Sequence, residues 1–434
     1  MLTLGRAAPR GCETRRPTWY SPTTIPRPLL AATFVGCAAF AGGLGLISHY
    51  APHRLWGLFA APAYLLAAAA ILAWKSRGVD LALVLGFGGA LGAPLSVLAI
   101  QGKWQPEVGV ITQSARLMVQ HGSPYEAPAV LAASHNPNIY DPYLPVMTLF
   151  GLPRALLGRG LLTDPRIWFC LVFVAAFGTA LALAGARDVF RWTALVTATP
   201  VIAFSLTVGG TDVPVLALLC LGFALLWRRP RPILAGIVLG LAAATKATAW
   251  PGLVVAMTLL AVRDGGRTTA RFTLAALAAA AVLIGPVAAL WPRTLVQNTV
   301  LFPLGLASIK SQAVSPLPGH LVADTGHIGH MIAVAALALA GLGIIVSLIV
   351  RPPRDVPSAT WRLIIGLALM FTLAPATRFG YFMYPLGLWA WLEVSLLGGS
   401  RPVAGTDREP SAPVLAGGGQ AGGGQAGGGQ AGGD

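Results

Sequence analysis

The sequence predicts an all-α, polytopic membrane protein of about 12 transmembrane helices, with additional juxtamembrane helices outside the bilayer. Of its 434 residues, 55% are hydrophobic and only 10% are charged, whereas soluble globular domains are about a quarter charged. The mean hydropathy is +0.70. Apolar runs of about 20 residues, the length that crosses a bilayer as a helix, recur along the chain.

The net charge of +15 at first suggests a nucleic-acid partner. The basic residues, however, stand in short clusters between apolar runs, which is where they determine membrane topology. We therefore expect no nucleic acid. The four cysteines show no metal-ligand spacing, and the pair His327 and His330 has no close acid, so we expect neither a metal nor a cofactor. The short basic clusters that determine topology are Arg228/Arg229/Arg231, Arg263/Arg267/Arg271 and Arg351/Arg354.

Four regions follow from composition. Residues 1–28 are basic and are expected in the cytoplasm, and residues 29–78 hold two transmembrane helices. Residues 79–397 form the main transmembrane domain, with outer loops at 101–143 and 292–327. Residues 398–434 end in repeated Ala-Gly-Gly-Gly-Gln units, which cannot bury a core and predict a disordered cytoplasmic tail.

The order of the spans follows from the positions of the positive charges. Five arginines in the first 27 residues place the N-terminus inside, so the loop 101–143 lies outside and both termini are cytoplasmic. Lys246 lies near the middle of the apolar run 233–261, where a charge costs about 2.5–3.5 kcal/mol. We therefore expect two short helices that meet near residues 245–248. The spans are expected near 29–48, 55–74, 79–100, 165–185, 192–208, 213–227, 233–245, 247–261, 272–291, 328–350, 362–375 and 380–397.

The apolar stretch 143–157 is the exception to this pattern. It has 15 residues, interrupted by Pro145 and Pro153, and as a helix would cover about 22 Å of a 30 Å core. If it crossed, every later arginine cluster would change sides. We expect it to lie against the outer leaflet as a juxtamembrane helix, although Arg154 and Arg159 favour the opposite placement.

Ionisable groups at a membrane edge are candidates for function because they are costly when unpaired. A carboxylate can take a proton from an attacking hydroxyl, and cations can neutralise the charge that develops on a departing phosphate. The outer face is expected to gather Glu107, Asp141, Asp212, Lys246, His320, His327 and Arg378.

Simpler roles compete for most of these residues. Glu107 precedes the amphipathic stretch 108–120 and would suit the positive end of a helix dipole. Asp212 is equally explained as a helix N-cap, Asp141 as a turn residue and Arg378 as a contact with lipid headgroups. Lys246, among alanines, adds little packing, and a functional role is favoured for it.

An ordered series of motifs resembles the C-type (GT-C) membrane glycosyltransferases, in particular the polyprenyl-phosphate-mannose-dependent mannosyltransferases of actinobacteria. The resemblance covers roughly residues 79–395. Its motifs are Glu107 followed by Ala115-Arg116-Leu117, Gly122-Ser123-Pro124-Tyr125, Tyr140 to Pro145, Gly210-Thr211-Asp212, and Leu239 to Thr248 around Lys246.

The resemblance implies that Glu107, where the family usually has Asp, is the catalytic base and that Lys246 binds the phosphate of the donor. It implies transfer of a sugar from a polyprenyl-phosphate donor to a glycan or glycolipid acceptor outside the plasma membrane. Mannose is favoured over arabinose as the sugar, and the transfer is expected to invert the anomeric carbon. Arg378 and His320 are expected to assist at the phosphate. Possible substrate contacts are Tyr140, Asp141, Tyr143 and Asp212.

Two alternatives remain open. A lipid or small-molecule transporter or flippase is expected to have repeated halves with interrupted helices, and the break at Lys246 has no evident counterpart in another half. A non-catalytic scaffold of cell-envelope assembly is also compatible with the sequence.

Overall fold

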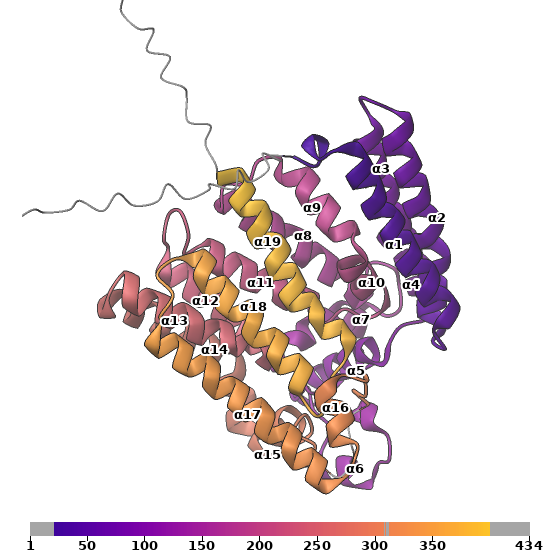
Figure 1. Cartoon of the computed structure of the whole chain (residues 1–434). Coiled ribbons are helices and arrows are strands. Elements are labelled where there is room, and N and C mark those ends of the chain that lie inside the picture. Colours follow the sequence, from indigo (N-terminus) through magenta and orange to yellow (C-terminus); the bar gives the residue numbers. More distant parts are fainter. Residues whose placement is uncertain (1–20, 308, 310–311, 400–434) are drawn as a thin grey trace, which may run out of the picture. The chain divides into compact units, whose positions relative to one another are not determined.

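Helices make up all the named secondary structure of the described residues, which are 21–307, 309 and 312–399 in this computed structural model. The glycine-rich tail and most of the basic N-terminal segment lie outside them. Seven long apolar helices match expected spans, so the predicted all-helical, polytopic fold is confirmed (Figure 1). These spans are α1 (Arg27–Ile47), α2 (Ala51–Ala73), Gly78–Gln101, α8 (Pro165–Leu183), α14 (Gly266–Leu290), α17 (His327–Val350) and α18 (Val356–Leu373).

The remaining expected spans are shorter or bent. The span Gly78–Gln101 contains α3 (Gly78–Phe87), the π-helical turn η2 (Gly88–Gly92) and α4 (Ala93–Gln101). Helices α9 (Val189–Ala198) and α10 (Pro200–Val208) meet at 65°, because Pro200 cannot donate a backbone hydrogen bond to continue α9. The short helices are α11 (Val213–Ala224), α12 (Pro232–Thr245), α13 (Trp250–Arg263) and α19 (Met383–Gly399). The number of about 12 crossings counts these helices and stays a prediction.

The two N-terminal helices pack into the rest of the bundle rather than standing apart from it. A Cβ on Gly57 of α2 would lie 2.5 Å from the carbonyl oxygen of Ala41 in α1, so only glycine permits this close helix crossing. The Tyr64 hydroxyl of α2 donates to the carbonyl of Ala198 at the end of α9, at 2.5 Å. The N-terminal hairpin is therefore part of the same packed unit.

Helix α11 lies at the centre of the packing. Eleven of its residues are buried, and it packs against α8, α12, α18 and α19. A helix that is apolar all round is stable only when neighbours surround it. The position of Asp212 at its start is consequently fixed by four other helices.

Short elements gather at one end of the long helices (Figure 1). The stretch 145–157 forms η4 (Pro145–Gly151) and α7 (Leu152–Leu157) and packs against α5 (Pro106–His121). Its placement on the outer leaflet remains a prediction. The other short elements are α6 (Pro128–Ala133), η3 (Pro137–Ile139), η5 (Ala247–Ala249), α15 (Pro292–Val296), η6 (Gln297–Leu301), α16 (Pro318–Ala323) and η7 (Phe379–Phe382). The turn η1 (Pro22–Thr24) is separate from them and packs against α9.

Candidate active site

The predicted break at Lys246 is confirmed. Helix α12 ends at Thr245, Lys246 is extended, and the 3-10 turn η5 leads into α13. Interrupted helices expose carbonyls that need partners where water is scarce. The amide of Leu144 donates to the carbonyl of Thr245 at 3.1 Å, and the Trp250 indole donates to the carbonyl of Ala243 at 3.1 Å. The break is thus stabilised by its surroundings, including the segment just after Tyr143.

Lys246 contacts one carboxylate and two aromatic rings. Its ammonium is 2.5 Å from the Asp212 carboxylate and lies 5.2 and 5.1 Å from the ring centres of Tyr143 and Tyr381. Both contacts are within the range of cation–π attraction. Tyr384 donates its hydroxyl to the same oxygen of Asp212 at 2.8 Å.

This geometry corrects the simpler interpretation of Asp212. The residue stands at the N-cap position of α11, but its side chain makes no capping hydrogen bond there. It accepts instead from Lys246 and Tyr384. Its role in the structure is to hold a cation, which the sequence pattern Gly-Gly-Thr-Asp did not distinguish from a cap.

Glu107 lies in the first turn of α5, as expected, and it also has a specific partner. Its Oε1 accepts from the guanidinium of Arg378, which is 271 residues away in sequence. Its other oxygen, Oε2, is buried and has no hydrogen-bond partner. Since buried carboxylate oxygens are ordinarily satisfied, this acid retains one unused acceptor.

Two connections link the ion pair of Glu107 to that of Lys246. Arg378 precedes the turn η7, which carries Tyr381, and the amide of Tyr381 donates back to the carbonyl of Arg378 at 3.1 Å. On the other side, the amide of Gln105, at the start of α5, donates to the carbonyl of Val208 at 2.8 Å. Val208 precedes Asp212 by four residues, so both pairs share two neighbouring segments of chain.

Asp141 supports the site rather than contacting Lys246. Its carboxylate accepts from the Ser114 hydroxyl at 2.5 Å and from the amide of Tyr143 at 2.9 Å, an Asx-type turn that orients Tyr143. Its own amide donates to the side chain of Asn298 at 2.8 Å. Burial raises the pKa of the Asp141 carboxyl to about 7, against the effect of these hydrogen bonds.

The two other predicted residues lie in different surroundings. Tyr140 stacks on Phe302, with ring centres 4.6 Å apart, in a small apolar cluster with Leu131. The Nδ1 atom of His320 lies 2.9 Å from the carbonyl of Pro375. That contact places His320 against the segment that leads to Arg378, and its role at a phosphate remains a proposal.

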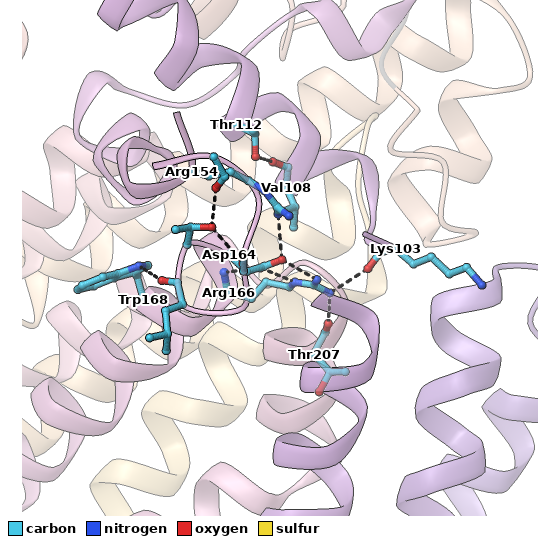
Figure 2. A network of polar contacts seen from close by, with 12 residues as sticks. Lys103, Val108, Thr112, Arg154, Asp164, Arg166, Trp168 and Thr207 are labelled. Carbon is cyan, nitrogen blue, oxygen red and sulfur yellow. Dashed lines mark hydrogen bonds and ion pairs between the residues drawn. The ribbon is translucent and has the colours of Figure 1, made fainter. Parts of the chain in front are cut away.

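A second group of buried charges was not predicted (Figure 2). Asp164 caps α8 by accepting from the amide of Arg166, and its carboxylate also pairs with the guanidinium groups of Arg154 and Arg166. Although burial acts to raise the pKa of Asp164, the bonds from Arg166 and the charge of Arg154 outweigh it and hold this pKa below its usual value. Arg166 also donates to the carbonyls of Lys103 and Thr207, at 3.1 and 2.7 Å.

The arginine contacts show that the end of α4, the start of α8 and the end of α10 lie at the same level. This agrees with the expected order of spans. The local sequence Asp164-Pro165-Arg166 indicates the start of α8, because an acid before a proline is a common helix start.

A histidine of the N-terminal hairpin also supports the start of α5, and this too was not predicted. The Nε2 atom of His53 lies 2.6 Å from the side-chain amide nitrogen of Gln105, and its Nδ1 lies 2.9 Å from the Ser48 hydroxyl. Because the amide nitrogen can only donate, Nε2 accepts and Nδ1 carries the proton. Helix α2 of the N-terminal hairpin thereby contacts Gln105, the N-cap residue of the helix that carries Glu107.

Two ion pairs, one of which leaves a carboxylate oxygen free, thus lie at one end of a polytopic helical bundle. The model of glycosyltransferase family 87 matches residues 142–375, more than half of the chain. The protein belongs to this family and is a membrane glycosyltransferase. Searches of curated proteins and of solved structures found no match.

The matched range includes Tyr143, Asp212, Lys246 and His320. It begins after Glu107 and ends before Arg378. The assignment of these last two residues therefore depends on their geometry in the structure.

Proposed function

We propose that this glycosyltransferase moves a sugar, with mannose as the first candidate, from a polyprenyl phosphate to a glycan or glycolipid acceptor at the extracytoplasmic face of the plasma membrane. The observation that carries the proposal is the carboxylate of Glu107, which has a free acceptor atom and pairs with Arg378. The short turn η7 joins Arg378 to Tyr381, which borders Lys246. Both termini are then cytoplasmic.

In this mechanism Glu107 accepts the proton of the acceptor hydroxyl as the hydroxyl oxygen attacks the anomeric carbon. The unused Oε2 is the atom available for that proton. The bond from the anomeric carbon to the phosphate oxygen breaks, and the electron pair leaves with the polyprenyl phosphate. A single displacement of this kind inverts the anomeric centre.

The leaving phosphate gains one negative charge, and fixed cations stabilise that charge better than mobile water does. Lys246 is the first candidate for this role, Arg378 is the second, and His320 is the third. Asp212 holds Lys246, and Tyr143 and Tyr381 border it. Tyr140 and Asp141 are proposed to shape the substrate side of the loop.

The test is a transfer assay with purified full-length protein in lipid nanodiscs. Radiolabelled polyprenyl-phosphate mannose, arabinose and glucose are each incubated with cell-envelope lipids, with nucleotide sugars as the control donors. Transfer of label from a polyprenyl phosphate supports the proposal. Transfer from nucleotide sugars with none from the polyprenyl phosphates would overturn the donor class.

A further inference from the structure

The contact between Glu107 and Arg378 conflicts with the proposed role of Glu107 as a base. A guanidinium that donates to a carboxylate stabilises its ionised form and makes it a weaker proton acceptor. Glu107 therefore becomes a stronger proton acceptor, at its free Oε2, when this pair opens or loosens. Something that enters the site has to compete for Arg378.

The charges of the site indicate the competitor. Lys246 is matched by Asp212 and Arg378 by Glu107, so the two pairs together are neutral. A polyprenyl-phosphate sugar adds one negative charge. That charge interacts most strongly with a cation whose own carboxylate partner has been released.

The two pairs differ in how easily they open. In the Lys246–Asp212 pair the side chains are 11% and 13% exposed, and Tyr384 adds a further hydrogen bond. In the other pair the Arg378 side chain is 32% exposed and Glu107 is 17% exposed. The pair of Glu107 is therefore the one that an incoming phosphate separates at lower cost.

The backbone of Arg378 is held while its side chain is accessible. Thr377 pairs with Val314 in an isolated parallel bridge, and the amide of Phe379 donates to the Ser315 hydroxyl at 3.1 Å. Three residues further on, Tyr381 borders Lys246. A change of partner would therefore move the arginine side chain and leave this backbone in place.

We infer that Arg378 changes partner during the reaction cycle: it holds Glu107 in the free enzyme and moves to the phosphate of the bound donor, which releases Glu107 as the base. This inference rests on the proposed function and adds an order to it, because the base becomes effective only after the donor has bound. The acceptor hydroxyl is then activated only when the sugar it attacks is present.

A double-mutant cycle on phosphate binding tests the exchange without requiring turnover. Equilibrium binding of farnesyl phosphate is measured on full-length protein in nanodiscs, with farnesol as the control for the isoprenoid. Glu107→Gln frees Arg378 and is expected to bind farnesyl phosphate about 10-fold more tightly. Arg378→Gln is expected to bind it about 10-fold more weakly, and farnesol binding is expected to change in neither variant.

The deciding variant is Glu107→Gln combined with Arg378→Gln. If Arg378 exchanges partners, the gain from Glu107→Gln disappears in this background. If the gain persists, Glu107 acts only by charge repulsion and the inference is wrong. An unchanged affinity in Glu107→Gln also contradicts it, because the pair would then be a static structural contact.

Two controls keep the outcomes separate. Glu107→Leu removes the same charge and replaces Glu107→Gln if that variant has a reduced melting temperature. Arg293→Gln changes an exposed arginine of α15 and is expected to leave binding unchanged. If the wild type does not bind farnesyl phosphate above farnesol, the proposed donor class fails, which is a different result from binding without coupling.

Discussion

Two groups of buried charges stand at the same end of this glycosyltransferase, and they are built differently. In the Asp164 cluster, which consists of Asp164, Arg154 and Arg166 (Figure 2), both carboxylate oxygens accept from arginines. Arg166 is fully buried and also donates to two backbone carbonyls. In the pair of Glu107, one carboxylate oxygen has a partner and the other has none.

The difference separates a structural cluster from a candidate reactive one. A buried ion pair is tolerated when hydrogen bonds satisfy all its polar atoms, and the Asp164 cluster fulfils that condition. The Glu107 and Lys246 pairs leave an unused oxygen and two aromatic faces. Such incomplete satisfaction is what a site needs if a substrate is to supply the missing partners.

The largest effect on activity is expected at Glu107. Glu107→Gln keeps the shape of the side chain but removes its ability to take a proton, so kcat should fall by about 10²–10⁴-fold, while the melting temperature stays near that of the wild type. Initial rates of sugar transfer measure this change. Glu126→Gln, in the same loop, is the matched control, and a normal rate in Glu107→Gln would remove Glu107 from the mechanism.

The largest effect on stability is expected in the Asp164 cluster. Arg166→Met leaves Asp164 buried with fewer partners, which costs about 3–5 kcal/mol of unfolding free energy. Denaturation followed in detergent measures the loss, and Arg159→Met, at an exposed arginine nearby, is the control. The folded fraction should retain its donor KM. A raised KM at normal stability would move Arg166 into the binding site.

A smaller, selective effect is expected at Lys246. Lys246→Met removes a charged partner of the donor phosphate, so the donor KM should rise about 10-fold to 100-fold. The double variant Lys246→Met, Asp212→Asn removes the unpaired acid and should recover stability without recovering affinity. Lys75→Met, between α2 and α3, serves as the control. An unaltered donor KM would show that Lys246 is only a partner of Asp212.

The smallest effect on activity is expected at Asp141, which contributes a pH dependence of stability. Its pKa is raised by burial from 3.8 to about 7, so the folded protein binds this proton more tightly than the unfolded chain does. The contribution to stability is complete below about pH 4 and is lost as the pH rises through 7. Asp141→Asn should reduce the change in melting temperature between pH 4 and 7. An unchanged slope would show that Asp141 does not titrate there.

The sequence predicted the features that depend on the free-energy cost of placing a residue in its local surroundings. A lysine in an apolar run is expensive, which led to the break at Lys246, and the amphipathic stretch after Glu107 predicted the helix α5. Glu107 lies in the first turn of α5, as a helix-start acid would, and its free Oε2 is also compatible with a role as base.

The partnerships were beyond the sequence because they join distant segments. Arg378 meets Glu107 across 271 residues, and nothing in the spacing of either indicates the other. Asp212 was equally compatible with an N-cap, and only the fold shows that its carboxylate faces Lys246. The sequence shows aromatic residues after Arg378, but it does not indicate that Tyr381 contacts Lys246.

The most direct test of the central claim is a structure of the full-length protein with farnesyl phosphate bound. We expect the phosphate between Lys246 and Arg378, with the guanidinium of Arg378 withdrawn from Glu107. At the other end of α8, a hollow of about 280 Å³ is lined by Arg228, Arg229 and Arg231. A phosphate bound only there, with the pair of Glu107 and Arg378 intact, would contradict the account.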